Sequence, residues 1–307
     1  MIMPSRLFRP AILLPAALAL IAATPASARW GETGHRIIAE AAVCALPAEM
    51  PAFFRAAMPQ LIWLNPEPDR WREFGESQLD NALASGSGLD HFIDFEGVPD
   101  AAFKAKDRYE FLATVKAAKL DQSVGFLPFR ITELTQTMRV DFRLWRAAID
   151  EATKRLLEAR IVNDAGILGH YVADGANPHH TTVHHNGWVG ENPDGFATDK
   201  QTHWRFESIY VNGHVALADV TPLVTAAPAV APNVRDAAMA YLRQTHTLLR
   251  PLYTLDKAER FDSNTVAPGH KQFVAQRLGA GATMLRDSWW TAWVTSGQPL
   301  PARAPRE

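Results

Sequence analysis

Cysteine is almost absent from this sequence, which contains Cys44 as its single cysteine in 307 residues. One cysteine cannot form an internal disulfide, so the hydrophobic core, with or without bound metal, must stabilise the fold. Because Cys44 stands in an apolar stretch with helical spacing, we expect it to be a buried and unreactive thiol.

The chain also lacks an excess of charge of either sign, with 31 Lys and Arg residues against 33 Asp and Glu residues. Composition therefore gives no broad basic surface, and any polynucleotide would have to be held locally, at a site. Hydrophobic residues make up 47% of the sequence and charged residues 21%, which is typical of a folded globular protein and argues against disorder.

Residues 1–28 have the three parts of a signal peptide, which are a positively charged start, an apolar run over residues 11–23 and the small residues "ASA" at 26–28. A membrane anchor is the alternative, but the apolar run is short for a membrane span. We expect cleavage after residue 28, or one residue later, so that residues 29–307 form one secreted or periplasmic domain.

Hydrophobic residues recur at helical spacing through most of the chain, and runs of alternating β-type residues are scarce. We therefore predict an all-α fold, a single compact domain of many helices. The expected helical segments are residues 35–46, 101–120, 130–160, 161–176, 203–212, 233–256 and 270–296.

Two further expectations concern where helices begin and where loops lie. Asn163 or Asp164 is expected to be the N-cap of the helix over residues 161–176. Residues 75–90 and 184–200 are rich in glycine, serine and other turn formers, and we expect both to be loops.

Seven of the eleven histidines fall in one stretch, residues 170–214. His170 and Asp174 are four residues apart in a helical segment, so both side chains project from one face and can bind one ion. The same spacing recurs at His203 and Glu207. A single pair of this kind is more often solvated or salt-bridged, but two pairs flanking a histidine-rich turn predict a metal site.

The turn between these two pairs contains His180, in a loop that can fold back over His170. Nitrogen and carboxylate ligands without thiolates suit zinc. We expect three other histidines of the turn to be supporting or surface residues and not ligands, namely His179, His184 and His185.

Three motifs resemble one family of enzymes. "WGETGHR" from Trp30, "HYVADGANPHH" from His170 and "HWRFE" from His203 are similar to motifs of the secreted three-zinc phosphodiesterases. This family comprises the single-strand-specific zinc nucleases and the bacterial zinc phospholipases C. The resemblance is spread over the mature chain but is strong only at these motifs. It implies a compact, mainly α-helical fold with a trinuclear zinc cleft.

The resemblance also implies roles for individual residues. It gives a set of zinc ligands, which are Trp30 through its free amine, His35, Asp69, His91, His170, Asp174, His180, His203 and Glu207. Asp174 would bridge two ions, and Arg72 would hold a phosphate oxygen. Asp80 is a rival to Asp69, because Asp69 and His91 are further apart than the family usually places them. A cut after residue 28 would leave one residue, to be trimmed, ahead of Trp30.

These ligands predict a hydrolase of phosphoric esters, with Asp69, Arg72 and Asp174 in catalytic roles and a zinc-activated water as nucleophile. The expected substrate is single-stranded nucleic acid or nucleotides. Trp188 is a candidate for stacking on a base, as is Trp63 or Phe92 near the other wall, although such rings more often serve core or loop packing.

Two other functions stay open. Glu207 favours a zinc phospholipase C, since the nucleases typically have aspartate at this position. A periplasmic zinc-binding protein without catalysis is the third reading. No obligate protein partner is predicted.

Overall fold

The computed structural model describes residues 31–301, and this part of the chain forms helices and no strand. The all-α prediction is thereby confirmed. The longer helices are α1 (Gly31–Cys44), α7 (Arg108–Ala117), α8 (Leu127–Ala147), α9 (Glu151–Asp174), α13 (Val234–His246), α14 (Leu249–Ala258) and α15 (Pro268–Ser296). The shorter ones are α2 (Ala52–Ala56), α3 (Met58–Leu64), α4 (Glu67–Arg70), α5 (Phe74–Leu79), α6 (Ala82–Gly88), α10 (Thr202–Trp204), α11 (Val211–His214) and α12 (Leu217–Val220).

Single turns of tighter or wider winding join these helices. The 3-10 turns are η1 (Leu89–His91), η2 (Phe95–Gly97), η3 (Ala102–Lys104), η4 (Pro178–Thr181) and η6 (Thr221–Leu223). The segment η5 (Arg205–Tyr210) is a π-helix that continues α10. Turns of π-helix are rare and are frequently found at functional sites.

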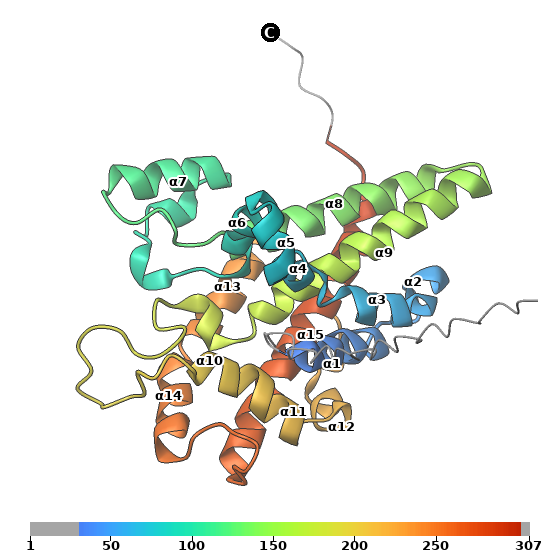
Figure 1. Cartoon of the computed structure of the whole chain (residues 1–307). Helices are drawn as coiled ribbons and strands as arrows, with labels where there is room; N and C mark the ends of the chain where they lie inside the picture. Colours follow the sequence, from blue (N-terminus) through green and yellow to red (C-terminus); the bar gives the residue numbers. More distant parts are fainter. Residues whose placement is uncertain (1–30, 302–307) are drawn as a thin grey trace, which may run out of the picture.

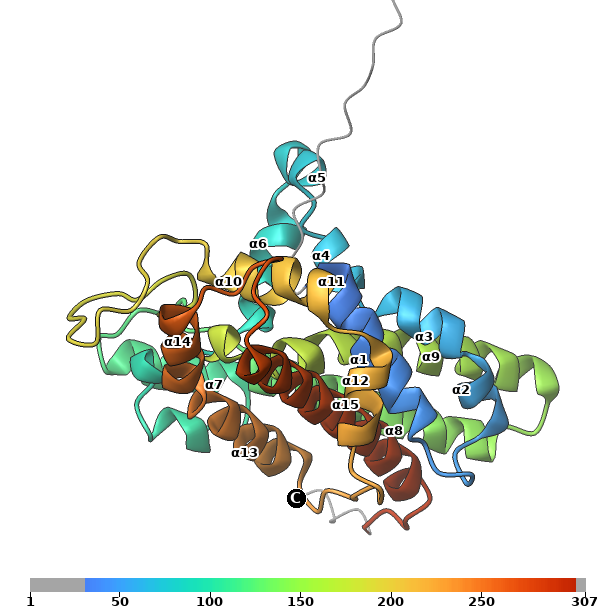
Figure 2. The ribbon, with the colours of Figure 1, turned by 90° about the horizontal axis from the view of Figure 1, so that it is seen from below.

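The body of the molecule is built around α8, α9 and α15. The helices α8 and α9 lie side by side, and α15 packs against both of them and against α1 (Figures 1 and 2). Trp289 of α15 is fully buried and donates a hydrogen bond of 3.2 Å to the main-chain oxygen of Ala165 in α9. Because its polar atom is satisfied, this large ring can fill the centre of the core without cost.

Two glycines of α9 allow α3 to approach closely. A Cβ atom on Gly166 would lie 2.3 Å from Leu64 Cβ, and one on Gly169 would lie 2.3 Å from Asn65 Nδ2. Neither position has room for a side chain. The small residues of α9 thus place Asn65 directly beside His170.

The structure corrects several of the expectations drawn from the sequence. The helix containing His170 begins much earlier than predicted, because Asp150 caps it by accepting a hydrogen bond from Thr153 N. Asn163 and Asp164 therefore lie inside α9 and cap nothing. Likewise, only Arg108–Ala117 of the segment 101–120 is a regular α-helix, where the side chain of Asp107 caps the first turn.

The segment 75–90 is not a loop, because it forms α5 and α6. The carboxylate of Glu73 accepts a hydrogen bond from Glu76 N and so begins α5. These two helices project from the body (Figure 2). Residues 184–200, by contrast, contain no helix, as predicted.

Cys44 is exposed and not buried, since it is the last residue of α1 and faces away from the core. None of the helices between residues 31 and 301 combines the length and the apolarity of a membrane span. The predicted signal peptide, residues 1–28, and the predicted ligand Trp30 lie outside the described residues.

Candidate metal centre

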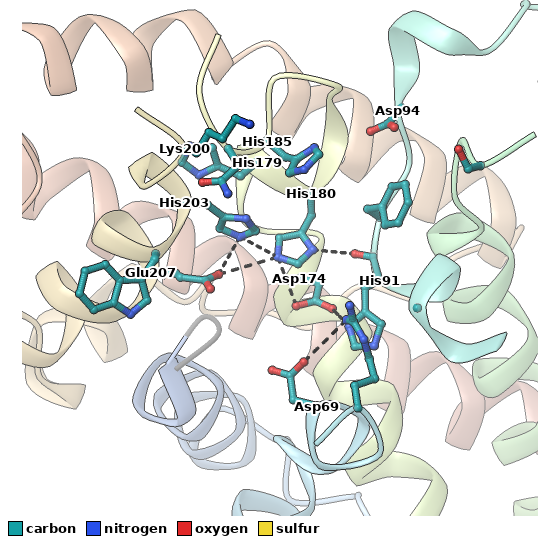
Figure 3. A pocket seen from close by; sticks show the side chains of 16 residues that line it. Asp69, His91, Asp94, Asp174, His179, His180, His185, Lys200, His203 and Glu207 are labelled. Carbon is teal, nitrogen blue, oxygen red and sulfur yellow. Dashed lines mark hydrogen bonds and ion pairs between the residues drawn. The ribbon is translucent and has the colours of Figure 1, made fainter. Parts of the chain in front are cut away.

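The predicted ligands within residues 31–301 meet at the floor of one cavity of about 630 Å³ (Figure 3). Those that line the cavity are Asp69, His91, Asp174, His180, His203 and Glu207. His35 and His170 complete the set, and both are fully buried. Three groups of these side chains could each hold a metal ion, since their ligand atoms lie within 4.8 Å of one another.

The first group combines η1 with the end of α9. Asp174 Oδ2 lies 2.9 Å from His91 Nδ1 and 3.3 Å from His170 Nε2. The two imidazole nitrogens are 3.0 Å apart. Asp69, at the end of α4, brings its Oδ1 to 4.0 Å from His170 Nε2. His91, His170 and Asp174 could thus hold one ion, and Asp69 approaches this group from the side of His170.

The second group consists of His180, His203 and Glu207. His203 Nε2 lies 2.8 Å from Glu207 Oε2, as expected for residues four apart on one helical face. His180 Nε2 is 3.1 Å from His203 Nε2 and 3.8 Å from Glu207 Oε2. His180 comes from η4, so the histidine-rich turn does fold back over the helix.

Asp174 lies between these two groups. Its Oδ2 faces His91 and His170, while its Oδ1 lies 3.7 Å from His180 Nε2. The two oxygens of one carboxylate therefore point to two different groups. This is the geometry that a bridging carboxylate requires.

The third group is made of His35, Asp69 and His170 and shares His170 with the first. His35 stacks on His170 with ring centroids 4.2 Å apart, and its buried Nε2 has no hydrogen-bond partner among residues 31–301. This nitrogen lies 3.7 Å from Asp174 Oδ1. Because one Nε2 atom binds one ion, an ion at His35 would need ligands other than His170.

Three of the imidazoles are oriented by hydrogen bonds on the side away from the site. His35 Nδ1 lies 2.9 Å from Asn65 Oδ1, and His170 Nδ1 lies 2.9 Å from the main-chain oxygen of Asn65. His180 Nδ1 lies 2.7 Å from the main-chain oxygen of His91. An oxygen of this kind only accepts, so each Nδ1 donates, and in the neutral imidazole each Nε2 then has a lone pair facing the site. Metal-binding histidines are commonly held in this way.

The negative charge of two buried carboxylates, Glu207 and Asp174, indicates a cation beside these groups. Burial raises the pKa of Glu207, but His203 and His180 outweigh it and bring this pKa down to about 2. Burial likewise opposes ionisation of Asp174, yet His170 and His180 hold its pKa well below the usual range. Both carboxylates are therefore ionised and buried, which is stable only with a positive charge beside them.

The imidazoles divide into neutral and protonated ones in the metal-free chain. Burial lowers the pKa of His35 and of His91 to about 3, so both are neutral, as a ligand must be. For His180, burial lowers the pKa, but Asp174 and Glu207 together raise it to about 9. A proton on His180 thus supplies the positive charge that a metal ion would replace.

The structure decides between the two rival aspartates. Asp80 is exposed at the end of α5, where its Oδ1 accepts a hydrogen bond from Ala82 N, and it belongs to none of the three groups. Asp69 belongs to one of them. Arg72 lines the cavity, with its Nη1 4.0 Å from Asp69 Oδ1.

Trp188, the predicted stacking residue, does not line the cavity. Its ring stacks on His184 with centroids 4.0 Å apart, and its Nε1 donates to the main-chain oxygen of Glu191. Trp63 is also outside the cavity, with Arg70 over its ring. Phe92 does line it. The loop 184–200 folds so that the ring of Trp188 serves packing.

Several residues of the site could not be recognised from any motif or spacing in the sequence. Asn65 and Asn177 support ligands, the latter through a hydrogen bond of 3.3 Å from Nδ2 to Glu207 Oε2. Asp94, Lys200 and Trp204 line the cavity. Burial, with the charges of nearby acidic residues, raises the pKa of Asp94 to about 7.

Comparison of the chain with protein-family models, with curated protein sequences and with solved structures finds no match. The function of the cavity therefore has to be inferred from the residues that form it.

Proposed function

We propose that this protein is a zinc-dependent phosphodiesterase that hydrolyses single-stranded nucleic acid. The observation that carries the proposal is the position of Asp174, whose two oxygens face two groups of imidazoles at the floor of one cavity. Two cation positions joined in this way are characteristic of enzymes that hydrolyse phosphate esters. The similarity of three sequence motifs to the three-zinc phosphodiesterases supports the same function.

The donor atoms fit zinc. All of them are imidazole nitrogens and carboxylate oxygens, and Cys44 lies elsewhere. One ion would be held by the first group together with Asp69, and another by the second group, with Asp174 between them. A third would be held at His35 and residues outside the described part of the chain. When bound, these ions activate water and neutralise phosphate charge.

The residues of the chain bind and orient the substrate. Arg72 stands at the wall of the cavity, and Asp69 restrains its guanidinium, so it can hold a phosphate oxygen next to the ions. Phe92 offers a ring on which a base can stack, the role first expected of Trp188. The burial of His35, His170 and Asp174 excludes bulk water from the floor.

A zinc phospholipase C is the second candidate, and two observations favour it. The acid of the second group is Glu207 and not aspartate. Phe92 and Asp94 line one cavity, and an aromatic ring with a carboxylate suits the quaternary ammonium of a choline head group.

The experiment compares substrates on one zinc-loaded preparation. The secreted protein is assayed on single-stranded RNA, single-stranded DNA and phosphatidylcholine vesicles, with EDTA-treated protein as control. We expect EDTA-sensitive cleavage of single-stranded nucleic acid. Cleavage of phosphatidylcholine alone would establish the second candidate, and bound zinc without hydrolysis of any phosphodiester would indicate a zinc-binding protein without catalysis.

A further inference from the structure

Two side chains that line the cavity have no part in holding the metal ligands. Lys200 and Trp204 both line the cavity, on either side of His203 in the sequence. Figure 3 shows Lys200 on the side of His203 and His185, with Asp94 across the cavity. The wall that contains Lys200 is therefore opposite the one that contains Asp94.

Trp204 is unusually exposed for a tryptophan beside the buried residues of η5. It is 46% exposed, although the residues that follow it in η5 are almost all buried. Within residues 31–301 no aromatic ring stacks on it and no guanidinium covers it, unlike Trp63, Trp188 and Trp293. An indole that faces a cavity without a protein partner is a surface for a flat ligand.

Lys200 is held at the wall by an uncommon backbone conformation. Its φ of 59° lies in the left-handed region, which a lysine rarely adopts. Gly187 packs against the backbone of this segment, where a Cβ would lie 3.3 Å from Lys200 N. No ion pair engages the Lys200 ammonium in the described part of the chain, although the preceding Asp199 is paired with Arg205. The cation is thus available to an anion in the cavity.

We propose that Lys200 and Trp204 form a second nucleotide position, in addition to the one at Phe92 and across the cavity from Asp94. This inference rests on the proposed function and specifies its substrate as a single-stranded oligonucleotide that spans the cavity. Trp204 would stack on a base, and Lys200 would bind the phosphate of the same nucleotide. Proteins that bind single strands combine these two elements, aromatic faces and cations along the backbone.

The pairing of these two residues argues against a lipid head group on this wall. A quaternary ammonium would also be attracted to an indole face, but the Lys200 ammonium would repel it. A base with its phosphate satisfies both side chains. A mononucleotide held at Phe92 alone would leave this wall uncovered.

Binding of an uncleavable oligonucleotide tests the proposal separately from catalysis. The probe is a fluorescein-labelled thymidine hexanucleotide with phosphorothioate linkages, and its affinity for the zinc-loaded protein is measured by fluorescence anisotropy. Trp204→Ala should weaken binding roughly 5- to 150-fold, the range that loss of one stacked base gives. Lys200→Gln should lower the slope of log affinity against log salt by about 0.7, which corresponds to one phosphate contact on a single strand.

The chain offers matched controls for both substitutions. Trp63→Ala removes a tryptophan that is 52% exposed but lies outside the cavity. Lys119→Gln removes the other lysine with a left-handed backbone, at a φ of 57°, also outside the cavity. Both controls should bind the probe like the wild type. Zinc content is measured for every variant. If Trp204→Ala loses zinc, the proposal is tested instead by the probe affinity of Trp204→Phe and the salt dependence of Lys200→Gln.

The kinetic counterpart is the ratio of kcat/KM for the unmodified hexanucleotide to that for bis(p-nitrophenyl) phosphate. Both cavity variants should lower this ratio roughly tenfold, since the small diester does not reach the second position. If the wild type cleaves the oligonucleotide while both variants keep the wild-type ratio and affinity, this inference fails and the proposed function stands. If the wild type cleaves no phosphodiester, the proposed function itself fails.

Discussion

His180 Nδ1 donates a hydrogen bond of 2.7 Å to the main-chain oxygen of His91, across 89 residues of sequence. A second hydrogen bond joins the same two segments, since Ile93 N donates to the main-chain oxygen of His180 at 2.9 Å. Each of these histidines belongs to a different candidate metal group. The two groups are therefore joined by two short hydrogen bonds that involve main-chain atoms of both segments.

Removal of His203 tests the metal centre most directly. His203→Ala should lose one zinc ion per chain and roughly 100-fold or more in activity, because it deletes a ligand beside the buried carboxylate of Glu207. Elemental analysis and the nuclease assay measure the two effects. His246→Ala, a partly exposed histidine outside the three groups, is the control. Full zinc content and a full rate in His203→Ala would show that the assignment is wrong.

Asn65 should matter to metal affinity although it binds no metal in this scheme. Asn65→Ala removes the acceptor of His35 Nδ1 and should weaken zinc binding roughly 10- to 100-fold, the range for supporting hydrogen bonds. Competition with a chelator of known affinity measures the change. Asn65→Asp, which keeps an acceptor oxygen, should retain more affinity, and the exposed Asn163→Ala should have none of this effect. Equal affinity of all three variants would exclude a supporting role.

Gly169 tests the close approach that positions Asn65. A Cβ on Gly169 would lie 2.3 Å from Asn65 Nδ2, so Gly169→Ala should reduce the free energy of unfolding by roughly 1–3 kcal/mol and weaken zinc binding as well. Denaturant unfolding and chelator competition measure the two changes. Gly86→Ala is the control, because no atom lies within 4 Å of its added Cβ, and it should be neutral or slightly stabilising. An unchanged zinc affinity in Gly169→Ala would mean that Asn65 is positioned in another way.

Asp94 should give the metal-free protein a pH dependence of known sign. Burial, together with Glu96 and Asp121, raises the pKa of this carboxyl to about 7 from an ordinary value of 3.8. Between these values the unfolded chain has lost the proton and the folded chain still holds it, so stability falls as the pH rises from about 4 to about 7. Asp94→Asn should remove the contribution of this carboxyl to the decrease in stability with rising pH.

The measurement is denaturant unfolding at pH 5 and pH 8 in the presence of a chelator. Asp94→Asn should lose less stability between the two pH values than the wild type does. Asp80→Asn replaces an exposed aspartate and should keep the wild-type difference. An equal loss of stability between pH 5 and pH 8 in Asp94→Asn and in the wild type would show that Asp94 is ionised in the folded protein well below pH 7.

The sequence by itself determined the features that depend on local spacing. Hydrophobic residues at helical intervals predicted the all-α fold, because the period of a helix is fixed by its backbone. Residues four apart on such a helix share a face, so the pairs His170–Asp174 and His203–Glu207 could be recognised before any tertiary contact was known. Capping and exposure were less predictable, since Asp150 begins α9 well before Asn163, and Cys44 faces solvent at the end of an apolar helix.

Only the tertiary structure decided which distant residues complete the site. Asp69 and not Asp80 reaches the metal groups, Asn65 supports two histidines, and Trp204 faces the cavity where Trp188 does not. These outcomes depend on how α3 and α4 pack against α9 and on how the loop 184–200 folds. No periodicity in the sequence specifies such contacts, because they result from close packing between segments that are far apart along the chain.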